Sequence, residues 1–401
     1  MRELLSVEEY LAELKALLHP EPGVETLALA AASGRVLALP VASRVDIPVF
    51  DNSAMDGYAV RFADVAALPA DLAVVGDVPA GSGEDPEAGP GECVRIMTGA
   101  PLPSFADTVV PLEDVTVVGG RIVVTAVPVG PGAHVRRAGE DIAAGALIAQ
   151  SGTALRPAML GALAASGVTA VAVHRRPVVA VCATGDELVS DGAPLQRGQI
   201  YESNAVALGA ALVRDGAEVL RTGPVRDQPE QLVAWLDQAA DRADIMVLTG
   251  GASVGAYDVV RDVLEQAGGT FRHVRMQPGK PQGWAMWRRT PVISLPGNPV
   301  SAVLSYEVFV RPLVDALLGR ASNRAFQAVA GMGWRSPAGR RQLVPVRLDT
   351  DADGRLIATP SHSRGSGSHL VTSPAMADGY AAVAEEVTEV AVGDKVMVRW
   401  L

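Results

Sequence analysis

The chain has 401 residues, of which 49% are hydrophobic and 20% are charged. This composition is typical of a folded protein of roughly two to four domains and excludes a disordered chain. The formal net charge of −11 argues against a nucleic-acid groove and an anionic membrane surface, because both bind basic patches.

The N-terminal segment predicts an amphipathic helix. Ser6 and Glu9 form a capping box ahead of leucines at helical spacing. We expect the helix to end near His19-Pro20, because proline cannot continue it. The segment carries too many charges for a signal peptide, and no apolar stretch is long enough to cross a membrane.

The two cysteines, Cys93 and Cys182, lie far apart in separate apolar runs. They are expected to be buried, reduced thiols rather than a disulfide or a metal site. Together with the N-terminal segment, they predict a cytoplasmic protein.

Residues 45–140 predict an all-β module. Short Val-rich runs alternate with Pro and Gly turns, and Gly119-Gly120 between two β-branched runs indicates a hairpin. Residues 141–172 resemble a linker with one helix, at ALRPAMLGALAAS.

Residues 173–320 show strands alternating with helices. Strands are expected at PVVAVCATG, AEVLRTGPV, ADIMVLTGG, FRHVRM and PVISLPG. Helices are expected at 203–213, where Ser203 or Asn204 is the cap, and at PEQLVAWLDQAAD, VVRDVLEQAG and PVSAVLSYEVFVRPLVDALLG. This alternation predicts a doubly wound parallel α/β sheet. Residues 321–401 return to short strands and predict a small β domain.

A glycine-rich loop follows one of these strands. In LTGGASVGAYD, at 248–258, three glycines alternate with small residues and a carboxylate closes the loop. Such a loop can turn its N–H groups toward an anion, and the next helix adds the positive end of its dipole. We interpret the loop as a phosphate cradle, although the GxxxxGK[ST] and GxGxxG fingerprints are both absent. The alternative is a turn packed against its own sheet.

Acidic residues follow the ends of the same strands. Ligands of a doubly wound sheet bind outside the carboxyl ends of its strands, where ATGDEL (183–188), the glycine loop and SLPGNPVS (294–301) are expected to meet. Glu187 and Asp258 would repel a phosphate unless a cation lies between them, and Mg²⁺ binds through one or two carboxylates plus phosphate oxygens. Asp227 is a third candidate, with an equally good alternative as an acid at a helix N-terminus.

Several polar residues outside these acids extend the predicted site. The chain has only three lysines, and Lys280 lies in the turn MQPGKPQG, where a fixed charge suits an oxyanion; an exposed turn lysine is the alternative. Ser301 lies near a helix start, where its hydroxyl either caps the helix or contacts a ligand. In the β module, DNSAMDGYAV (51–60) holds more polar residues than a tight turn needs, and GEDI (139–142) adds two acids.

In this order, the segments DNSAMDGYAV, RIMTGAPLP, GEDI, TGDEL, GQIYESN, TGGASVGAYD, PGKP and LPGNPVSA resemble the motifs of the molybdopterin molybdenumtransferases. This MoeA-type family is similar to the E domain of gephyrin, and the resemblance spans essentially the whole chain. It implies a homodimer of multidomain subunits of class α/β plus β. The implied parts are a discontinuous mixed helical and linker domain (1–44 and 141–172), the inserted β module (45–140), a molybdopterin-binding doubly wound α/β domain (173–320) and a C-terminal β barrel (321–401).

The resemblance also implies the reaction. Family members take adenylylated molybdopterin and molybdate, insert molybdenum at the dithiolene and release AMP with Mg²⁺ or a similar divalent ion. The residues that match the acidic catalytic set are Asp56, Asp141, Glu187, Asp227 and Asp258, and the last three are expected to hold the metal. The residues that match substrate-binding positions are Thr249, Gly250, Gly251, Ser253, Gly255, Lys280, Pro281, Pro296, Gly297, Asn298, Ser301 and Arg341.

The sequence departs from the family pattern at two positions. Relatives often have lysine where this chain has Gln277, and many carry a further arginine near Pro345. Less positive charge weakens oxyanion binding unless Arg275, Arg341 or Arg347 supplies it, so the preference between molybdate and tungstate stays open.

Two other functions remain alternatives. One is adenylyl transfer to molybdopterin, the preceding step, although the long N-terminal region argues against it. The other is a dimeric scaffold that binds a partner peptide, although the intact acidic set argues against it. A molybdopterin adenylyltransferase is a further expected partner, because it would hand over the adenylylated substrate.

Overall fold

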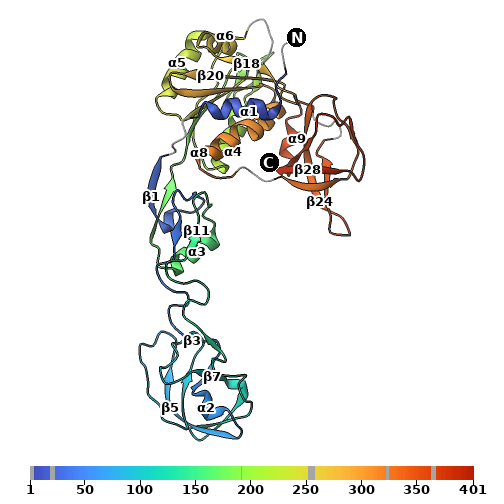
Figure 1. Cartoon of the computed structure of the whole chain (residues 1–401). Coiled ribbons are helices and arrows are strands. Elements are labelled where there is room, and N and C mark those ends of the chain that lie inside the picture. Colours follow the sequence, from blue (N-terminus) through green and yellow to red (C-terminus); the bar gives the residue numbers. More distant parts are fainter. Residues whose placement is uncertain (1–3, 19–22, 191, 252–257, 322–324, 363–366) are drawn as a thin grey trace. The chain divides into compact units, whose positions relative to one another are not determined.

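The computed structural model describes residues 4–18, 23–190, 192–251, 258–321, 325–362 and 367–401. Its contacts divide the chain into two compact units. The first unit comprises residues 1–25, 34–38 and 173–401, and the second comprises residues 26–33 and 39–172. Figure 1 labels the elements of both units.

A six-stranded sheet lies at the centre of the first unit. Its strand order is β16 (Glu218–Arg221), β13 (Val178–Ala183), β17 (Ile245–Thr249), β21 (Thr290–Leu295), β20 (Pro281–Trp287) and β18 (Thr270–His273). The first four strands are parallel, as predicted, whereas β20 pairs antiparallel with both β21 and β18. Strand β20 was not predicted from the sequence. The two-residue turn between β20 and β21 places Arg288 at a φ of 55°, the backbone of a tight hairpin.

Helices cover both faces of this sheet. Alternate strand residues point to opposite faces. Val179 and Val181 of β13 pack with α1 (Val7–Ala16), α4 (Asn204–Arg214) and the helices of 299–317, whereas Ala180 and Cys182 pack with α5 (Pro229–Ala240) and α6 (Val259–Gln266). The doubly wound α/β layer is therefore confirmed, with an antiparallel edge.

The predicted long helix contains a change of pitch. It runs as α7 (Pro299–Ser305), a π-helical segment η3 (Tyr306–Val310) and α8 (Arg311–Leu317). Pro312 lacks an N–H and would clash with a carbonyl one turn earlier in a regular helix, so the wider turn directly before it has a physical cause. The segment also buries Tyr306, whose hydroxyl donates to Asp215 Oδ2 over 2.7 Å.

Helix α1 belongs to the first unit rather than to the neighbourhood of residues 141–172. The capping box is present as predicted, with Glu9 N donating to Ser6 Oγ over 3.1 Å. Tyr10 is fully buried and meets Phe309 of η3 edge to face, with ring centroids 4.9 Å apart. These contacts explain why α1 packs in the same unit as the α/β layer. The division of the chain into four domains stays a prediction.

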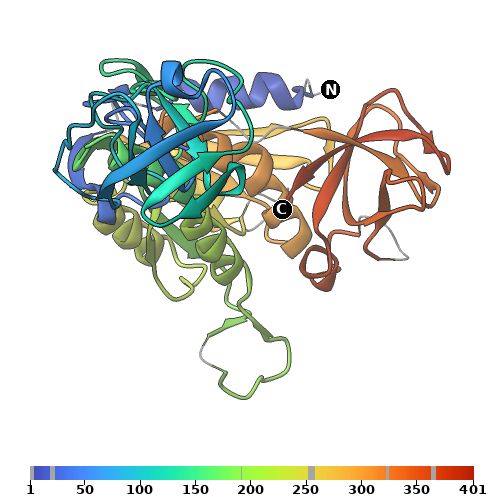
Figure 2. The same cartoon turned by 90° about the horizontal axis from the view of Figure 1, so that it is seen from below.

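The C-terminal residues form the predicted barrel. Strands β24 (Arg341–Thr350), β25 (Leu356–Pro360), β22 (Phe326–Ala330), β28 (Lys395–Trp400) and β26 (Gly379–Val383) close on one another, because β26 pairs with both β28 and β24. Figure 2 shows these strands in orange and red from a second side. The short β19 (Met276–Gln277) pairs with β24 and joins the barrel to the α/β layer. The smaller elements here are β23 (Trp334–Arg335), β27 (Glu389–Val390) and α9 (Thr372–Ala375).

The second unit is built on another six-stranded sheet. Its order is β7 (Thr108–Pro111), β4 (Gly57–Val60), β6 (Glu92–Ile96), β5 (Ala70–Val78), β9 (Arg121–Val124) and β8 (Val115–Val118). Gly119 and Gly120 have φ values of 54° and 81° and form the predicted hairpin between β8 and β9. The helix expected in 141–172 is α3 (Pro157–Ala165). The remaining elements of the unit are β2 (Val41–Ala42), β3 (Asn52–Ser53), α2 (Phe62–Val65), η2 (Leu112–Asp114), β10 (Val135–Arg136) and β11 (Leu147–Ala149).

Strands β1 (Val24–Ala28) and β12 (Ala170–His174), with the short helix η1 (Leu29–Ala31), lie where the chain passes between the units. Both cysteines are buried and free, as predicted. Among the described helices, none is both long enough and apolar enough to cross a membrane.

Candidate functional site

A cavity of about 460 Å³ opens at the carboxyl ends of β13, β17 and β21. This is the edge at which a doubly wound sheet binds ligands. The described residues that line the cavity are Ala183, Thr184, Gly185, Glu187, Leu188, Ile200, Tyr201, Glu202, Ser203, Asn204, Asp227, Thr249, Gly250, Gly251, Asp258, Val259, Pro281, Pro296, Gly297, Asn298 and Pro299. The described residues of the three predicted loops therefore line one space, which we name the strand-end cavity.

Two glycines of the loop are required by the chain itself. Gly250 has a φ of 104°, and a Cβ there would lie 2.7 Å from the Thr184 carbonyl oxygen. Gly251 has a φ of 72°, and a Cβ there would lie 2.7 Å from Asp258 Oδ1 and would overlap the Val260 side chain. These contacts explain the two glycines without a ligand, as the alternative hypothesis of a turn packed against its own sheet requires. Ser253 and Gly255 lie outside the described residues.

Asp258 is the N-cap of α6. Its Oδ1 accepts a hydrogen bond from Arg261 N over 3.1 Å, and the residue is only 9% exposed. Burial raises the pKa of the Asp258 carboxyl, and the negative charge of Asp227 adds to the rise, whereas Arg261 opposes it. The Asp258 carboxylate has therefore lost hydration that its interactions with Arg261 replace only in part.

Asp227 lies in the same acidic environment. Partial desolvation raises its pKa, and the charges of Asp186 and Glu187 raise it further. Its backbone N–H donates to Asp186 Oδ1 over 3.3 Å. Asp186 was not predicted as a site residue, although its position directly before Glu187 in the run TGDEL was a usable signal.

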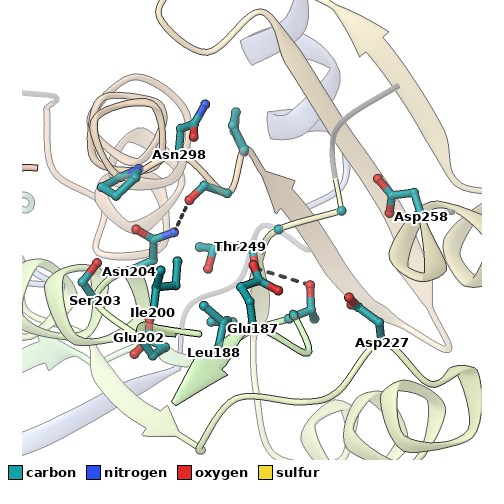
Figure 3. A pocket seen from close by; sticks show the side chains of 18 of the residues that line it. Glu187, Leu188, Ile200, Glu202, Ser203, Asn204, Asp227, Thr249, Asp258 and Asn298 are labelled. Carbon is teal, nitrogen blue, oxygen red and sulfur yellow. Dashed lines mark hydrogen bonds between the residues drawn. The ribbon is translucent and has the colours of Figure 1, made fainter. Parts of the chain in front are cut away.

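Glu187 folds back over the turn that precedes it. A Cβ at Gly185 would lie 2.7 Å from the Glu187 carboxyl carbon, so only glycine leaves room for this carboxylate. The Glu187 carbonyl accepts from Ile200 N over 2.9 Å. In the view of Figure 3, the carboxylates of Glu187, Asp227 and Asp258 lie toward one side of the cavity, and Asn204 and Asn298 lie toward the other.

The cavity also holds an unpaired hydroxyl. Thr249 is 1% exposed, and within the described part of the chain its Oγ1 has no hydrogen-bond partner. A buried hydroxyl without a partner is unfavourable, so this atom is available to a ligand or to a water molecule. Asn204 Nδ2 donates to the Gly297 carbonyl over 2.7 Å and ties α4 to the loop before α7.

Some of the residues predicted to bind the substrate line the cavity, and others do not. Thr249, Gly250, Gly251, Pro281, Pro296, Gly297 and Asn298 line the cavity. Lys280 is half-buried directly before Pro281 and is not among the lining residues. Ser301 is 3% exposed in the first turn of α7. Arg341 pairs with Glu8 of α1 over 2.5 Å, away from the lining set.

No lysine or arginine is among the described residues that line the cavity. Two of the arginines expected to replace the missing charge, Arg275 and Arg347, are engaged elsewhere. Arg275 pairs with Glu385 over 2.8 Å, and Arg347 Nε donates to the Met376 carbonyl. Gln277 accepts from Arg340 over 3.1 Å. An anion in the cavity therefore needs the α6 dipole, backbone N–H groups or a bound cation.

The other two predicted acids belong to the second unit. Asp56 Oδ1 accepts from Thr98 N over 2.6 Å and from Thr98 Oγ1 over 2.7 Å, and these bonds lower its pKa. Asp141 is exposed, and its backbone N–H donates to the Ile47 carbonyl. Within the described ranges, no three His, Cys, Asp or Glu side chains come close enough together to hold a metal ion.

Three family models match successive parts of the chain. They are the MoeA N-terminal region (domain I and II) over residues 5–167, a probable molybdopterin binding domain over 180–316 and the MoeA C-terminal region (domain IV) over 327–401. Together they span nearly the whole length.

Named relatives agree with these matches. The chain is 40% identical over 411 residues to molybdopterin molybdenumtransferase 2 of Mycobacterium tuberculosis, covering 99% of each chain. It is 42% identical over 313 residues to the molybdopterin molybdenumtransferase of Nostoc sp., covering 76% of this chain and 72% of that one. A molybdopterin biosynthesis MoeA protein structure from Pyrococcus horikosii is similar with a TM-score of 0.81, 34% identity and 99% coverage of both chains.

Proposed function

The chain belongs to the MoeA family of molybdopterin molybdenumtransferases, and we propose that it inserts molybdate-derived molybdenum into adenylylated molybdopterin with release of AMP. Membership makes it an enzyme of molybdenum cofactor biosynthesis. The adenylylated substrate and the release of AMP are the proposed part. The observation that supports them most is the strand-end cavity, whose described lining includes the acids Glu187, Glu202, Asp227 and Asp258, the last at the N-cap of α6, and contains no lysine or arginine.

Mg²⁺, or a similar divalent ion, suits this acidic set. Burial raises the pKa of Asp258, whereas partial desolvation and the charges of Asp186 and Glu187 raise the pKa of the exposed Asp227. A nearby cation would offset both effects. Among the described residues, no three acids lie close enough together to hold a metal ion. Mg²⁺ needs only one or two carboxylates when phosphate oxygens supply the other ligands, so we propose that the protein ligands come from Glu187, Asp227 and Asp258, one or two of them at a time. When bound, the ion would neutralise negative charge on the phosphates.

The protein's own groups would hold the phosphate anhydride and the metal ion. The N-terminus of α6 and the backbone of Gly250 and Gly251 would orient the phosphates. Asp258 Oδ1 already accepts a hydrogen bond from Arg261 N, so Oδ2 is the oxygen that we propose binds the metal ion.

Molybdate, as the second substrate, would be held by Lys280 and Ser301, with Arg341 after release of its ion pair with Glu8. Because Gln277 is held by Arg340 and supplies no charge, we propose weak binding of the oxyanion. Competition between molybdate and tungstate in the AMP-release assay would measure the preference.

The deciding experiment is AMP release from adenylylated molybdopterin with Mg²⁺, with and without molybdate. We expect molybdate-dependent release and molybdenum retained on the pterin. Glu187→Gln should lower the rate by at least about a hundredfold, as expected for loss of a metal ligand. Glu265→Gln is the matched control, since Glu265 makes an exposed pair with Arg261 on α6.

The alternatives give different results. Formation of adenylylated product from ATP and molybdopterin without molybdate would identify the preceding step of the pathway. Absence of AMP release under both conditions would favour a scaffold. We also propose a homodimer and an adenylyltransferase partner, which analytical ultracentrifugation of the chain alone and of the mixture would test.

A further inference from the structure

The lip of the strand-end cavity is a short two-stranded ladder. Strand β14 (Leu188–Val189) pairs in parallel with β15 (Ile200–Tyr201). Ile200 N donates to the Glu187 carbonyl and Glu202 N donates to the Val189 carbonyl, each over 2.9 Å. The ladder therefore joins the acidic residue Glu187 on one side to the start of α4 on the other. Figure 2 shows residues 192–199 of the connecting segment, in light green, extending away from the helices of the first unit.

Tyr201 belongs to two cavities at once. It lines the strand-end cavity, where it is the one aromatic residue among the described lining residues. It also lines a neighbouring cavity of about 490 Å³, together with Glu202, Val206, Arg221 and residues 222–224. We name this second space the side cavity. Both volumes fall in the range of about 300–1,000 Å³ that is usual for small-molecule sites.

The Tyr201 ring is free to take a ligand. The residue is 51% exposed, and its neighbour Ile200 is 54% exposed. In the described part of the chain, the close ring pairs are Tyr10 with Phe309 and Phe326 with Trp400, so no aromatic side chain covers Tyr201. An aromatic face at the shared wall of two cavities is a surface on which a planar ring can stack.

The charges of the side cavity favour a neutral ring over a second phosphate. Arg221 supplies one positive charge, but Glu202 brings a carboxylate to the same cavity. Glu202 Oε1 accepts from Ala205 N over 2.6 Å, which leaves Oε2 for an N–H donor of a ligand. A guanidinium also stacks on planar rings. A nitrogen heterocycle with N–H donors satisfies both side chains.

We propose that Tyr201 stacks on a planar nitrogen heterocycle of the substrate, and that the side cavity receives this ring while the strand-end cavity holds the phosphates. The proposal rests on the proposed function, because an adenylylated pterin carries such rings beside its phosphates. Adenine and the pterin share the required chemistry, and the experiment separates them.

Direct binding of small probes tests the proposal without turnover. Isothermal titration with the full chain would use AMP, ribose 5-phosphate and 6-hydroxymethylpterin. Tyr201→Leu should lower the affinity for one ring-bearing probe by about tenfold, the scale of a lost stacking contact. The affinity for ribose 5-phosphate should not change. Tyr201→Phe should bind like the wild type. Leu195→Ala, an exposed position on the segment between the strands, is the matched control.

The probe whose affinity falls in Tyr201→Leu identifies the ring. A weaker affinity for AMP indicates adenine, and a weaker affinity for 6-hydroxymethylpterin indicates the pterin. Equal binding of every probe to the wild type and to Tyr201→Leu overturns the proposal. A loss that includes ribose 5-phosphate overturns it as well, because the effect is then not one of ring stacking. A wild type that binds neither ring-bearing probe more tightly than ribose 5-phosphate also overturns it.

Kinetics separate this proposal from the proposed function. If the wild type releases AMP, Tyr201→Leu should raise KM by about tenfold with little change in kcat, because the ring does not touch the reacting atoms. A wild type that releases no AMP refutes the proposed function, and the titrations still decide the role of Tyr201. Unchanged thermal melting of Tyr201→Leu would show that the half-exposed side chain is not needed for folding.

Discussion

At the residue scale, the end of β17 shows how backbone conformation and close packing determine residue type. Gly251 combines a φ of 72° with contact to Asp258 and Val260 at the position where a Cβ would lie. Any other residue would be strained by its backbone and would push the N-cap of α6 away from its place.

We therefore predict that Gly251→Ala lowers the free energy of unfolding by about 2 kcal/mol or more. Urea denaturation followed by circular dichroism would measure the loss. Gly223→Ala is the control, because a Cβ there meets no atom within 4 Å. Equal stability of the two variants would show that the loop adopts another conformation in solution.

The acids of the same cavity are held at a cost to stability. Partial desolvation and neighbouring carboxylates raise the pKa of Asp227 in the folded state. A raised pKa means that folding favours the protonated form, so this stabilisation is complete below the unfolded-state pKa and is lost as the pH rises through the folded-state pKa. At neutral pH the ionised Asp227 destabilises the metal-free fold.

Asp227→Asn should therefore raise the melting temperature of the metal-free protein at neutral pH, and the gain should disappear in acid. The same change should lower Mg²⁺-dependent AMP release by at least about a hundredfold. Differential scanning calorimetry at two pH values, paired with the AMP assay, would check both effects. A variant that melts earlier than the wild type at neutral pH would refute the electrostatic account.

At the element scale, the start of α4 separates what the sequence predicts from what it does not. The apolar spacing predicts the helix, and the structure confirms it at Asn204–Arg214. Ser203 is the N-cap, but its φ of −128° and ψ of −22° lie outside the extended region, and its side chain makes no capping bond. The Glu202 carboxylate accepts from Ala205 N instead. The sequence alone cannot show that Glu202 rather than Ser203 accepts the hydrogen bond from Ala205 N. The choice depends on the backbone conformation with which the chain enters the helix.

The capping assignment leads to a paired prediction. Glu202→Ala should destabilise the protein by about 1 kcal/mol, the usual value of a helix cap, whereas Ser203→Ala should have almost no effect. Chemical denaturation of the two variants side by side would measure the difference. The reverse order would mean that Ser203 is the true capping side chain.

The sheet of the first unit shows the same division. Continuous apolar runs identified β13, β17 and β21, because buried parallel strands carry such runs. Strand β20 was missed because its residues, PQGWAMW, mix polar and aromatic types. Its antiparallel direction follows from the turn at Arg288. The long helix was predicted correctly in extent, but its π-helical segment depends on how Pro312 is accommodated and is not visible in the apolar spacing.

At the scale of the whole molecule, motif order predicted more than local pattern did. The segment around Asp56 has no function that its own residues reveal, yet it belongs to the set of motifs that indicated the family. The five predicted acids fall on both units: Glu187, Asp227 and Asp258 on the first, and Asp56 and Asp141 on the second. Arg341 was predicted from its motif alone, and its ion pair with Glu8, which is distant in sequence, cannot be seen in that motif.

The homodimer that we propose allows the acids of two subunits to serve one reaction, and complementation would test this. Asp56→Asn and Glu187→Gln should each inactivate their own homodimer. If acids of the first unit act with Asp56 of the partner, a heterodimer of the two variants contains one intact set and should show about half the wild-type activity. If they act within one subunit, that heterodimer has no intact set.

The reciprocal heterodimer makes the test complete. A subunit that carries both changes, paired with a wild-type subunit, retains one intact set only when the acids act within a subunit. Co-expression with two different affinity tags would isolate each heterodimer, and AMP release would be measured for both. If the acids of one site come from two subunits, the first heterodimer should be active and the second inactive. If they come from one subunit, the first heterodimer should be inactive and the second active. Under either arrangement, only one of the two heterodimers contains a site with both Asp56 and Glu187 unchanged.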